Sequence, residues 1–149
     1  MEARASLFTV VVGCGRLGSY LANKLSLEGH SLVVVDIEET AFDALSAEYS
    51  GFRVEGDATE LAVLKRAKMD KADLVIAATG DDNVNLMTAQ IAGRIFQVPR
   101  VLARIYDPGR SEIYRELGID GICPTVIAGD VFLSAYAESV PRTAGEDQS

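Results

Sequence analysis

The chain has 149 residues, 48% of them hydrophobic, and a formal net charge of -8 at pH 7. This is the length of one ordinary domain, and the acidic balance excludes a nucleic-acid partner because the average field of the protein repels phosphate backbones. Cys14 and Cys123 stand in no metal-ligand spacing, and no apolar run has the length of a membrane span. These features predict a reduced, cytoplasmic protein without a metal site.

Apolar runs and helix-like patterns alternate along the chain. The expected strands are 7–12, 32–35, 52–54, 74–78, 100–105 and 119–122, and the helical patterns are 17–27, 39–49, 60–67, 81–96, 111–117 and 124–137. The strands are rich in Val, Ile and Leu without polar alternation, which is typical of strands buried on both faces. Six βα units predict an α/β fold, a Rossmann-like doubly wound six-stranded parallel sheet with a C-terminal crossover helix.

No repeat or linker interrupts this pattern, so residues 1–140 are expected to form one domain. The tail 141–149 is polar and rich in small residues, and is expected to be disordered. The expected helix-terminal residues are Thr59 and Asp81 as N-caps and Gly29 and Gly118 as C-terminal glycines.

The segment GCGRLG follows the first strand directly and opens the first helix. In this G-x-G-x-x-G pattern Gly13 permits the tight turn, Gly15 lets a pyrophosphate approach the backbone, and Gly18 allows close packing of helix on strand. The phosphate is expected on the positive end of the helix that begins near Arg16.

Asp36 ends the second expected strand, eighteen residues after Gly18. At this place a carboxylate accepts hydrogen bonds from the ribose hydroxyls of an adenine nucleotide. Glu38 and Glu39 follow closely and would repel a 2′-phosphate, so NADP is disfavoured relative to NAD or a simple adenine nucleotide.

Two further loops follow strands at the edge of the sheet where ligands bind. After the third strand, Gly56 would let the chain pass close to a flat adenine, and Asp57 could accept from the adenine amino group or cap the next helix. After the fourth strand, Thr79 and Gly80 could border the phosphates or the ribose, whereas Asp81 suits a cap.

Two arginines are open to two interpretations each. Arg16 could fold over a phosphate or face solvent. Arg104 lies within the apolar fifth strand and needs a partner if buried, either a ligand phosphate or an acid such as Asp81.

The motifs VVGCGRLGSYLANKL, LVVVDIEE, GDATE, ADLVIAATGDDNVNLMTAQIA, VLARIYDP and LGIDGICPT occur in this order. Together they make the chain, over about residues 7–140, resemble the nucleotide-binding domain of bacterial potassium-transport regulators, called TrkA-N, KTN or RCK. Full regulators of this family carry a further C-terminal domain with no counterpart in these 149 residues, and the residue at position 14 varies among them.

The resemblance implies a cytosolic Rossmann domain, peripheral to the inner membrane through a potassium channel or transporter partner. It also implies NAD(H) or ATP, ADP or AMP as the ligand, a homodimer or larger ring, and ligand exchange that controls K⁺ transport. The ligand contacts that it implies are Gly13, Gly15, Arg16, Leu17, Gly18, Asp36, Ile37, Asp57, Ala58, Thr79, Gly80 and Arg104.

An enzymatic role is not expected. Nicotinamide dehydrogenases need a second domain and an acid–base pair, and the only histidine, His30, falls in a turn at the opposite edge of the sheet from the ligand loops. Cys14 is expected to be a small filler in the glycine turn and not a redox group. Alternative functions are a small NAD-dependent oxidoreductase fragment and a nucleotide sensor for another membrane partner.

The last expected helix is apolar on more of its surface than one core contact requires. Val126, Gly129, Leu133, Tyr136 and Val140 form one stripe. A neighbouring stripe consists of Ile127, Val131 and Ala135, with Phe132 as a further apolar position. We expect this helix to pack on its own sheet and on the partner of a homodimer; the alternative is a helix buried fully within its own domain.

Overall fold

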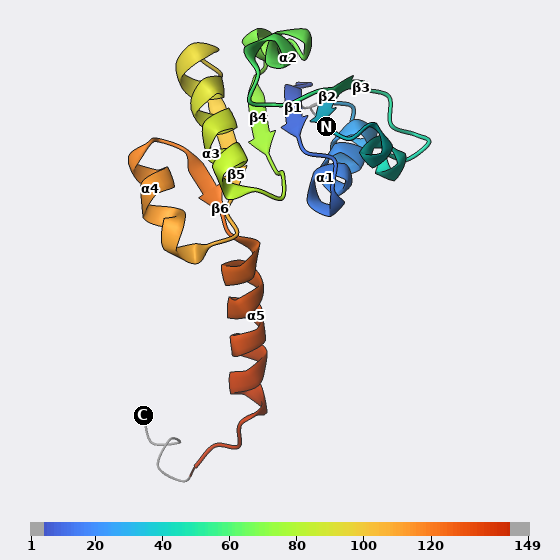
Figure 1. The fold of residues 1–149 in the computed structure, drawn as a ribbon. Coiled ribbons are helices and arrows are strands. Elements are labelled where there is room, and N and C mark those ends of the chain that lie inside the picture. Colours follow the sequence, from blue (N-terminus) through green and yellow to red (C-terminus); the bar gives the residue numbers. More distant parts are fainter. Residues whose placement is uncertain (1–4, 144–149) are drawn as a thin grey trace.

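The computed structural model describes residues 5–143 and contains one parallel six-stranded sheet (Figure 1). The strands are β1 (Phe8–Val12), β2 (Ser31–Asp36), β3 (Phe52–Glu55), β4 (Leu74–Ala77), β5 (Arg100–Arg104) and β6 (Asp120–Ile122). Their order in the sheet is β3-β2-β1-β4-β5-β6, and all neighbours pair in parallel. This is the doubly wound Rossmann order, so the predicted fold class is confirmed.

Helical segments connect the strands. The α-helices are α1 (Arg16–Leu27), α2 (Leu61–Arg66), α3 (Asp82–Gln90), α4 (Ser111–Glu116) and α5 (Pro124–Ser139). The shorter helical turns are η1 (Glu39–Ala44), η2 (Met69–Lys71), the π-helical η3 (Ile91–Ile95) that continues α3, and η4 (Pro108–Arg110).

A hydrophobic core lies on each face of the sheet. On one face, Leu64 of α2, Ala89 of α3 and Tyr114 of α4 pack against strand residues such as Val75. On the other face, Ala22 of α1 packs with Phe42, Leu45 and Tyr49 against the remaining strand side chains. Because both faces of the central strands are covered, their sequences are continuous apolar runs.

The second crossover differs from the prediction of a helix over residues 39–49. Only η1 is helical there, as a 3₁₀-helix, and residues 45–49 are not helical. Phe42, Leu45 and Tyr49 have helix-like spacing and are all buried, and the Tyr49 hydroxyl donates to the Phe52 carbonyl oxygen at 2.8 Å. A 3₁₀ turn followed by an irregular segment therefore buries the residues that suggested a helix.

The helix-terminal predictions divide. Gly29 and Gly118 have φ of 90° and 73° at helix ends, as predicted. The carboxylate of Asp81 caps α3 by accepting from the backbone N–H groups of Asn83 and Val84.

The prediction that Thr59 caps α2 is wrong. Its hydroxyl donates to Asp57, and α2 begins only at Leu61. Of the expected tail, residues 144–149 lie outside the described part.

The α5 helix stands away from the rest of the domain (Figure 1). None of its residues is buried, and Val131, Phe132, Leu133 and Tyr136 are each at least 66% exposed. The expectation that α5 packs on its own sheet, and the alternative of full burial within its own domain, are both wrong for the single chain. Within residues 5–143, no helix is long and apolar enough to cross a membrane.

Candidate ligand-binding site

A cavity of about 560 Å³ opens at the carboxyl ends of the strands, where the sheet order reverses between β1 and β4. This is where open α/β sheets bind ligands. The lining residues are Val12, Gly13, Gly15, Arg16, Val35, Asp36, Ile37, Gly56, Asp57, Ala58, Ala78, Thr79, Gly80, Asp81, Val84, Arg104 and Tyr106.

The glycine turn after β1 has the geometry predicted for it. Gly13 has φ of 103°, and its N–H donates to the Val35 carbonyl oxygen at 2.7 Å. A Cβ on Gly18 would overlap the Gly13 carbonyl oxygen, so helix and turn are packed as closely as their backbones permit. At Gly15, by contrast, a Cβ would meet no atom within 4 Å. The backbone is therefore open to a ligand at Gly15.

The amino end of α1 is available to an anion. Its N-cap is Gly15, which provides no side-chain hydrogen bond, and its first turn contains no acidic residue. The positive end of α3 differs because Asp81 caps it. Of the two helices that start beside the cavity, α1 thus retains backbone N–H donors for a phosphate group.

Asp36 ends β2 beside the glycine turn. Its Oδ2 accepts from the Cys14 N–H and its Oδ1 from the Glu38 N–H, both at 2.8 Å. A carboxylate has about four acceptor positions, so each oxygen can still accept a hydroxyl. The side chain is half-buried and already oriented, as a ribose-binding carboxylate requires.

The loop after β4 and the end of β5 form the opposite wall. The Arg104 guanidinium lies 4.1 Å from the centre of the Tyr106 ring, and its Nε is buried with no hydrogen-bond partner in the described range. Arg104 is the last residue of β5 and not a mid-strand residue. Within residues 5–143 it forms no ion pair with Asp81, so that alternative is not supported.

Asp57, two residues after the end of β3, is held in a local turn. Its Oδ1 accepts from the N–H of Thr59 at 2.9 Å and from the Thr59 hydroxyl at 2.7 Å. The Thr59 backbone and side-chain hydrogen bonds lower the pKa of Asp57. A Cβ on Gly56 would meet the Val63 side chain, so packing against α2 already accounts for that glycine.

Cys14 is buried beside Asp36, with 1% of its surface exposed. Burial, together with the nearby Asp36 charge, raises the pKa of its thiol to about 11. A protonated, enclosed thiol is a poor nucleophile and suits the predicted packing role. Residues 5–143 contain no group of three or more His, Cys, Asp or Glu side chains placed to hold a metal ion.

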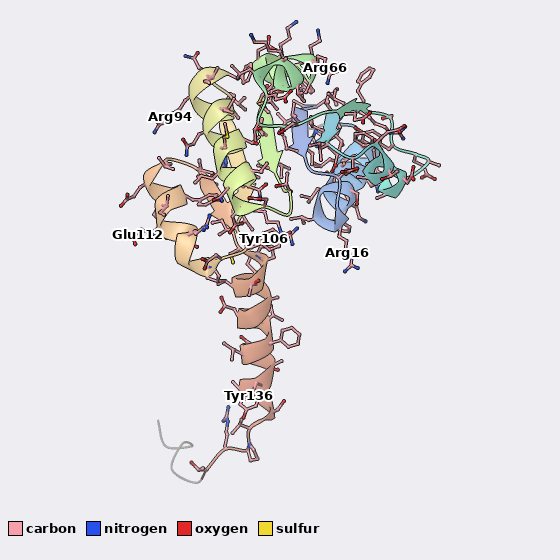
Figure 2. All side chains as sticks on the ribbon, in the orientation of Figure 1. Arg16, Arg66, Arg94, Tyr106, Glu112 and Tyr136 are labelled. Carbon is pink, nitrogen blue, oxygen red and sulfur yellow. The ribbon has the colours of Figure 1, made fainter. Side chains whose placement is uncertain are left out.

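Ten of the twelve predicted contact residues line the cavity; the exceptions are Leu17 and Gly18. Gly18 supports the site from behind by packing on Gly13, and Leu17 lies outside the lining. Arg16 is exposed at the start of α1, and Tyr106 lies beside the amino end of α5 (Figure 2). Sequence reasoning missed Tyr106, although its place just after β5 put it at the ligand edge.

The fold and the position of this cavity define a Rossmann-type α/β domain with a candidate ligand site where the strand order reverses. Residues 9–124 match the TrkA-N domain family, and the chain belongs to that family. The Trk system potassium uptake protein TrkA of Streptomyces coelicolor is 41% identical over 117 residues, covering 78% of this chain and 51% of that protein. A TrkA homolog of Methanothermobacter thermautotrophicus is 33% identical over 116 residues, covering 78% and 53%. The chain thus spans about half the length of these relatives.

Solved structures share the fold at lower identity. The TrkA-N domain of the inner membrane protein ybaL from Escherichia coli has a TM-score of 0.77 at 21% identity, covering 88% of this chain and 97% of that one. The AMP-bound Kef CTD of Shewanella denitrificans has a TM-score of 0.76 at 20% identity, covering 90% and 82%. The GsuK channel bound to NAD has a TM-score of 0.66 at 21% identity, covering 83% and 22%.

Proposed function

We propose that this domain binds an adenine nucleotide, either NAD(H) or ATP, ADP or AMP. The observation that carries this proposal is the uncapped amino end of α1 beside the oriented Asp36 carboxylate in one cavity. The first provides donors for phosphate, and the second provides acceptors for ribose hydroxyls. The AMP and NAD bound to two proteins of the same fold support the proposal.

The experiment is to identify and then measure the ligand. Mass spectrometry of the denatured, purified protein identifies the small molecules that co-purify with it. Calorimetry on protein freed of ligand then compares NADH, NAD, ATP, ADP and AMP, with NADP as the control that Asp36 should reject. Absence of binding by all five adenine ligands would overturn the proposal.

The biological role that follows is control of potassium transport. We propose that the domain is a cytoplasmic regulatory part of a K⁺ channel or transporter and is peripheral to the inner membrane through that pore partner. The curated relatives named as Trk potassium uptake proteins support this role. Complementation of a strain that lacks the gene tests it: restored K⁺ uptake should depend on Asp36. A nucleotide sensor for another membrane partner would restore no K⁺ phenotype.

We further propose that the domain is not an enzyme. His30 accepts a hydrogen bond from the Leu7 N–H through Nδ1 at the amino end of β2, away from the cavity. The cavity lining contains no histidine, cysteine or lysine. The alternative, a small NAD-dependent oxidoreductase fragment, predicts NADH oxidation with a carbonyl substrate that a cavity substitution abolishes. We expect no such turnover.

The exposed α5 helix supports a homodimer, and a larger ring could be built from such dimers. Leu102 on β5 and Ile122 on β6 are both incompletely buried, and Ile122 is 43% exposed. Leu102 pairs with Ile76, and Ile76 packs against the core on the face of the sheet that α1 covers. Leu102 therefore lies on the same face, beyond α1, where no helix of this chain covers the sheet. We propose that α5 of a second copy covers it. An apolar helix and an uncovered apolar sheet face on one chain are complementary surfaces.

A further inference from the structure

Asn85 is a fully buried amide that lies behind the cavity wall and not in it. It sits in the first turn of α3 with 0% of its surface exposed. Its Oδ1 accepts from the N–H of Thr79 at 2.8 Å and from the Thr79 hydroxyl at 2.6 Å. Its Nδ2 donates to the carbonyl oxygens of Thr79 at 3.1 Å and Arg104 at 3.2 Å. All four hydrogen-bonding positions of the amide are therefore occupied.

These four bonds join the two segments that form the opposite wall of the site. Thr79 belongs to the loop after β4, Arg104 ends β5, and both line the cavity. The ladder between these strands ends at the pair Ala77 and Ala103, so Asn85 extends the connection past the last paired residues. Asp82, one turn earlier, accepts from the N–H groups of Tyr106 and Asp107. The start of α3 thus holds the β4 loop and the segment after β5 together.

We propose that Asn85 is the positioning residue for a second set of phosphate contacts, on the wall formed by Thr79 and Arg104, opposite the amino end of α1. It fixes the Arg104 backbone beside the Thr79 loop. Arg104 lines the cavity, and its guanidinium carries the positive charge that an anion there would meet. This inference rests on the proposed nucleotide binding. Asp36 and the glycine turn are held separately from this wall, because Asp36 is oriented by Cys14 and Glu38 and not by Asn85. Loss of Asn85 should therefore weaken the binding of phosphates and leave nucleoside binding unchanged.

The test compares two nearly isosteric replacements on one helix. Asn85→Leu removes all four hydrogen bonds. Thr88→Val is the matched control, because Thr88 is also fully buried on α3 but its hydroxyl has no partner in the described chain. The affinities of the full chain for ADP and for adenosine are measured by ligand-detected NMR competition. Thermal unfolding is followed in parallel.

We expect Asn85→Leu to lower the affinity for ADP at least tenfold and to change that for adenosine less than twofold. Thr88→Val should change neither. A folded Asn85→Leu protein with the wild-type ratio of ADP to adenosine affinity would overturn the inference, and so would equal losses for both ligands, which indicate a general structural role.

A second variant serves if Asn85→Leu does not fold. Asn85→Asp keeps the shape and the oxygen that accepts from Thr79 but loses both donor bonds, to the carbonyl oxygens of Thr79 and Arg104. It should show the same selective loss for ADP. If neither variant folds, the role of Asn85 is structural and the inference fails. A wild-type protein that binds none of NADH, NAD, ATP, ADP and AMP refutes the proposed function itself, and this result is obtained before any variant is made.

Discussion

The backbone N–H of Cys14 donates a 2.8 Å hydrogen bond to Oδ2 of Asp36, which joins the glycine turn after β1 to the end of β2. The Glu38 N–H holds the other carboxylate oxygen at the same distance. The two elements that we propose bind phosphate and ribose are therefore oriented relative to each other before any ligand arrives. Such preorganisation lowers the ordering cost of binding.

The first prediction concerns the Asp36 carboxylate. Asp36→Ala should weaken the binding of ADP or NADH at least tenfold, because each charge-assisted hydrogen bond to a ribose hydroxyl contributes about 1.5–3 kcal/mol. Calorimetry measures the effect. Asp43→Ala is the matched control: it removes the same charge from an exposed position on η1 that does not line the cavity. Equal affinities of wild type and a folded Asp36→Ala protein would refute the role of Asp36.

The second prediction separates two glycines of one motif. Gly18→Ala should destabilise the fold by about 1–3 kcal/mol or more, because its Cβ would overlap the Gly13 carbonyl oxygen. Gly15→Ala should fold normally, since Gly15 has φ of -78° and open space around it, yet lose nucleotide affinity because the methyl group occupies the approach of the pyrophosphate. Urea unfolding and calorimetry distinguish the two effects. Similar stability losses in both variants would contradict this division.

The third prediction concerns pH and the Cys14 thiol. A rise of its pKa from 9.0 to about 11 lowers its thiolate fraction at pH 8 about 100-fold. In a Cys123→Ser background, alkylation by iodoacetamide should therefore be slow at pH 8 in the native protein and fast in denaturant. A native rate equal to the denatured rate would contradict the prediction.

The same shift has a consequence for stability. Below pH 9 the thiol is protonated in both the folded and the unfolded state, so its contribution to stability is fully present. Between pH 9 and about 11 only the unfolded state ionises, and the free energy of unfolding should fall as pH rises. Cys14→Ala should remove this part of the alkaline decline in urea midpoints.

The fourth prediction concerns α5. Leu133→Glu combined with Tyr136→Glu should convert a dimer into a folded monomer, because both side chains are at least 67% exposed in the single chain and would place charge in an apolar contact. Light scattering gives the mass, and circular dichroism checks the fold. Thr125→Glu with Ser134→Glu adds the same charge at positions already polar and should leave the dimer intact. An unchanged dimer in the first variant would place the interface elsewhere.

The parallel sheet and most residues of the candidate site could be predicted from the sequence, because the patterns that indicate them are local. Continuous apolar runs between crossovers predict parallel strands, and Gly13 and Gly18 are required where the turn has positive φ or meets another backbone. Asp36 and the loops that begin at Gly56 and Thr79 follow strands, so the topology alone brings them to one edge of the sheet.

Other features depended on contacts between distant segments, which spacing does not encode. Phe42, Leu45 and Tyr49 are buried in a 3₁₀ turn and an irregular segment, and an α-helix with the same spacing would bury them equally well. Asn85 reads in sequence as one polar residue of α3, and only folding brings it to Arg104, nineteen residues away. The apolar surface of α5 revealed the need for a covering partner, but an apolar pattern is the same whether its own sheet or another chain supplies that partner. The tertiary structure shows that the sheet of the same chain does not cover α5. The helix leaves the domain directly after β6, and none of its residues is buried.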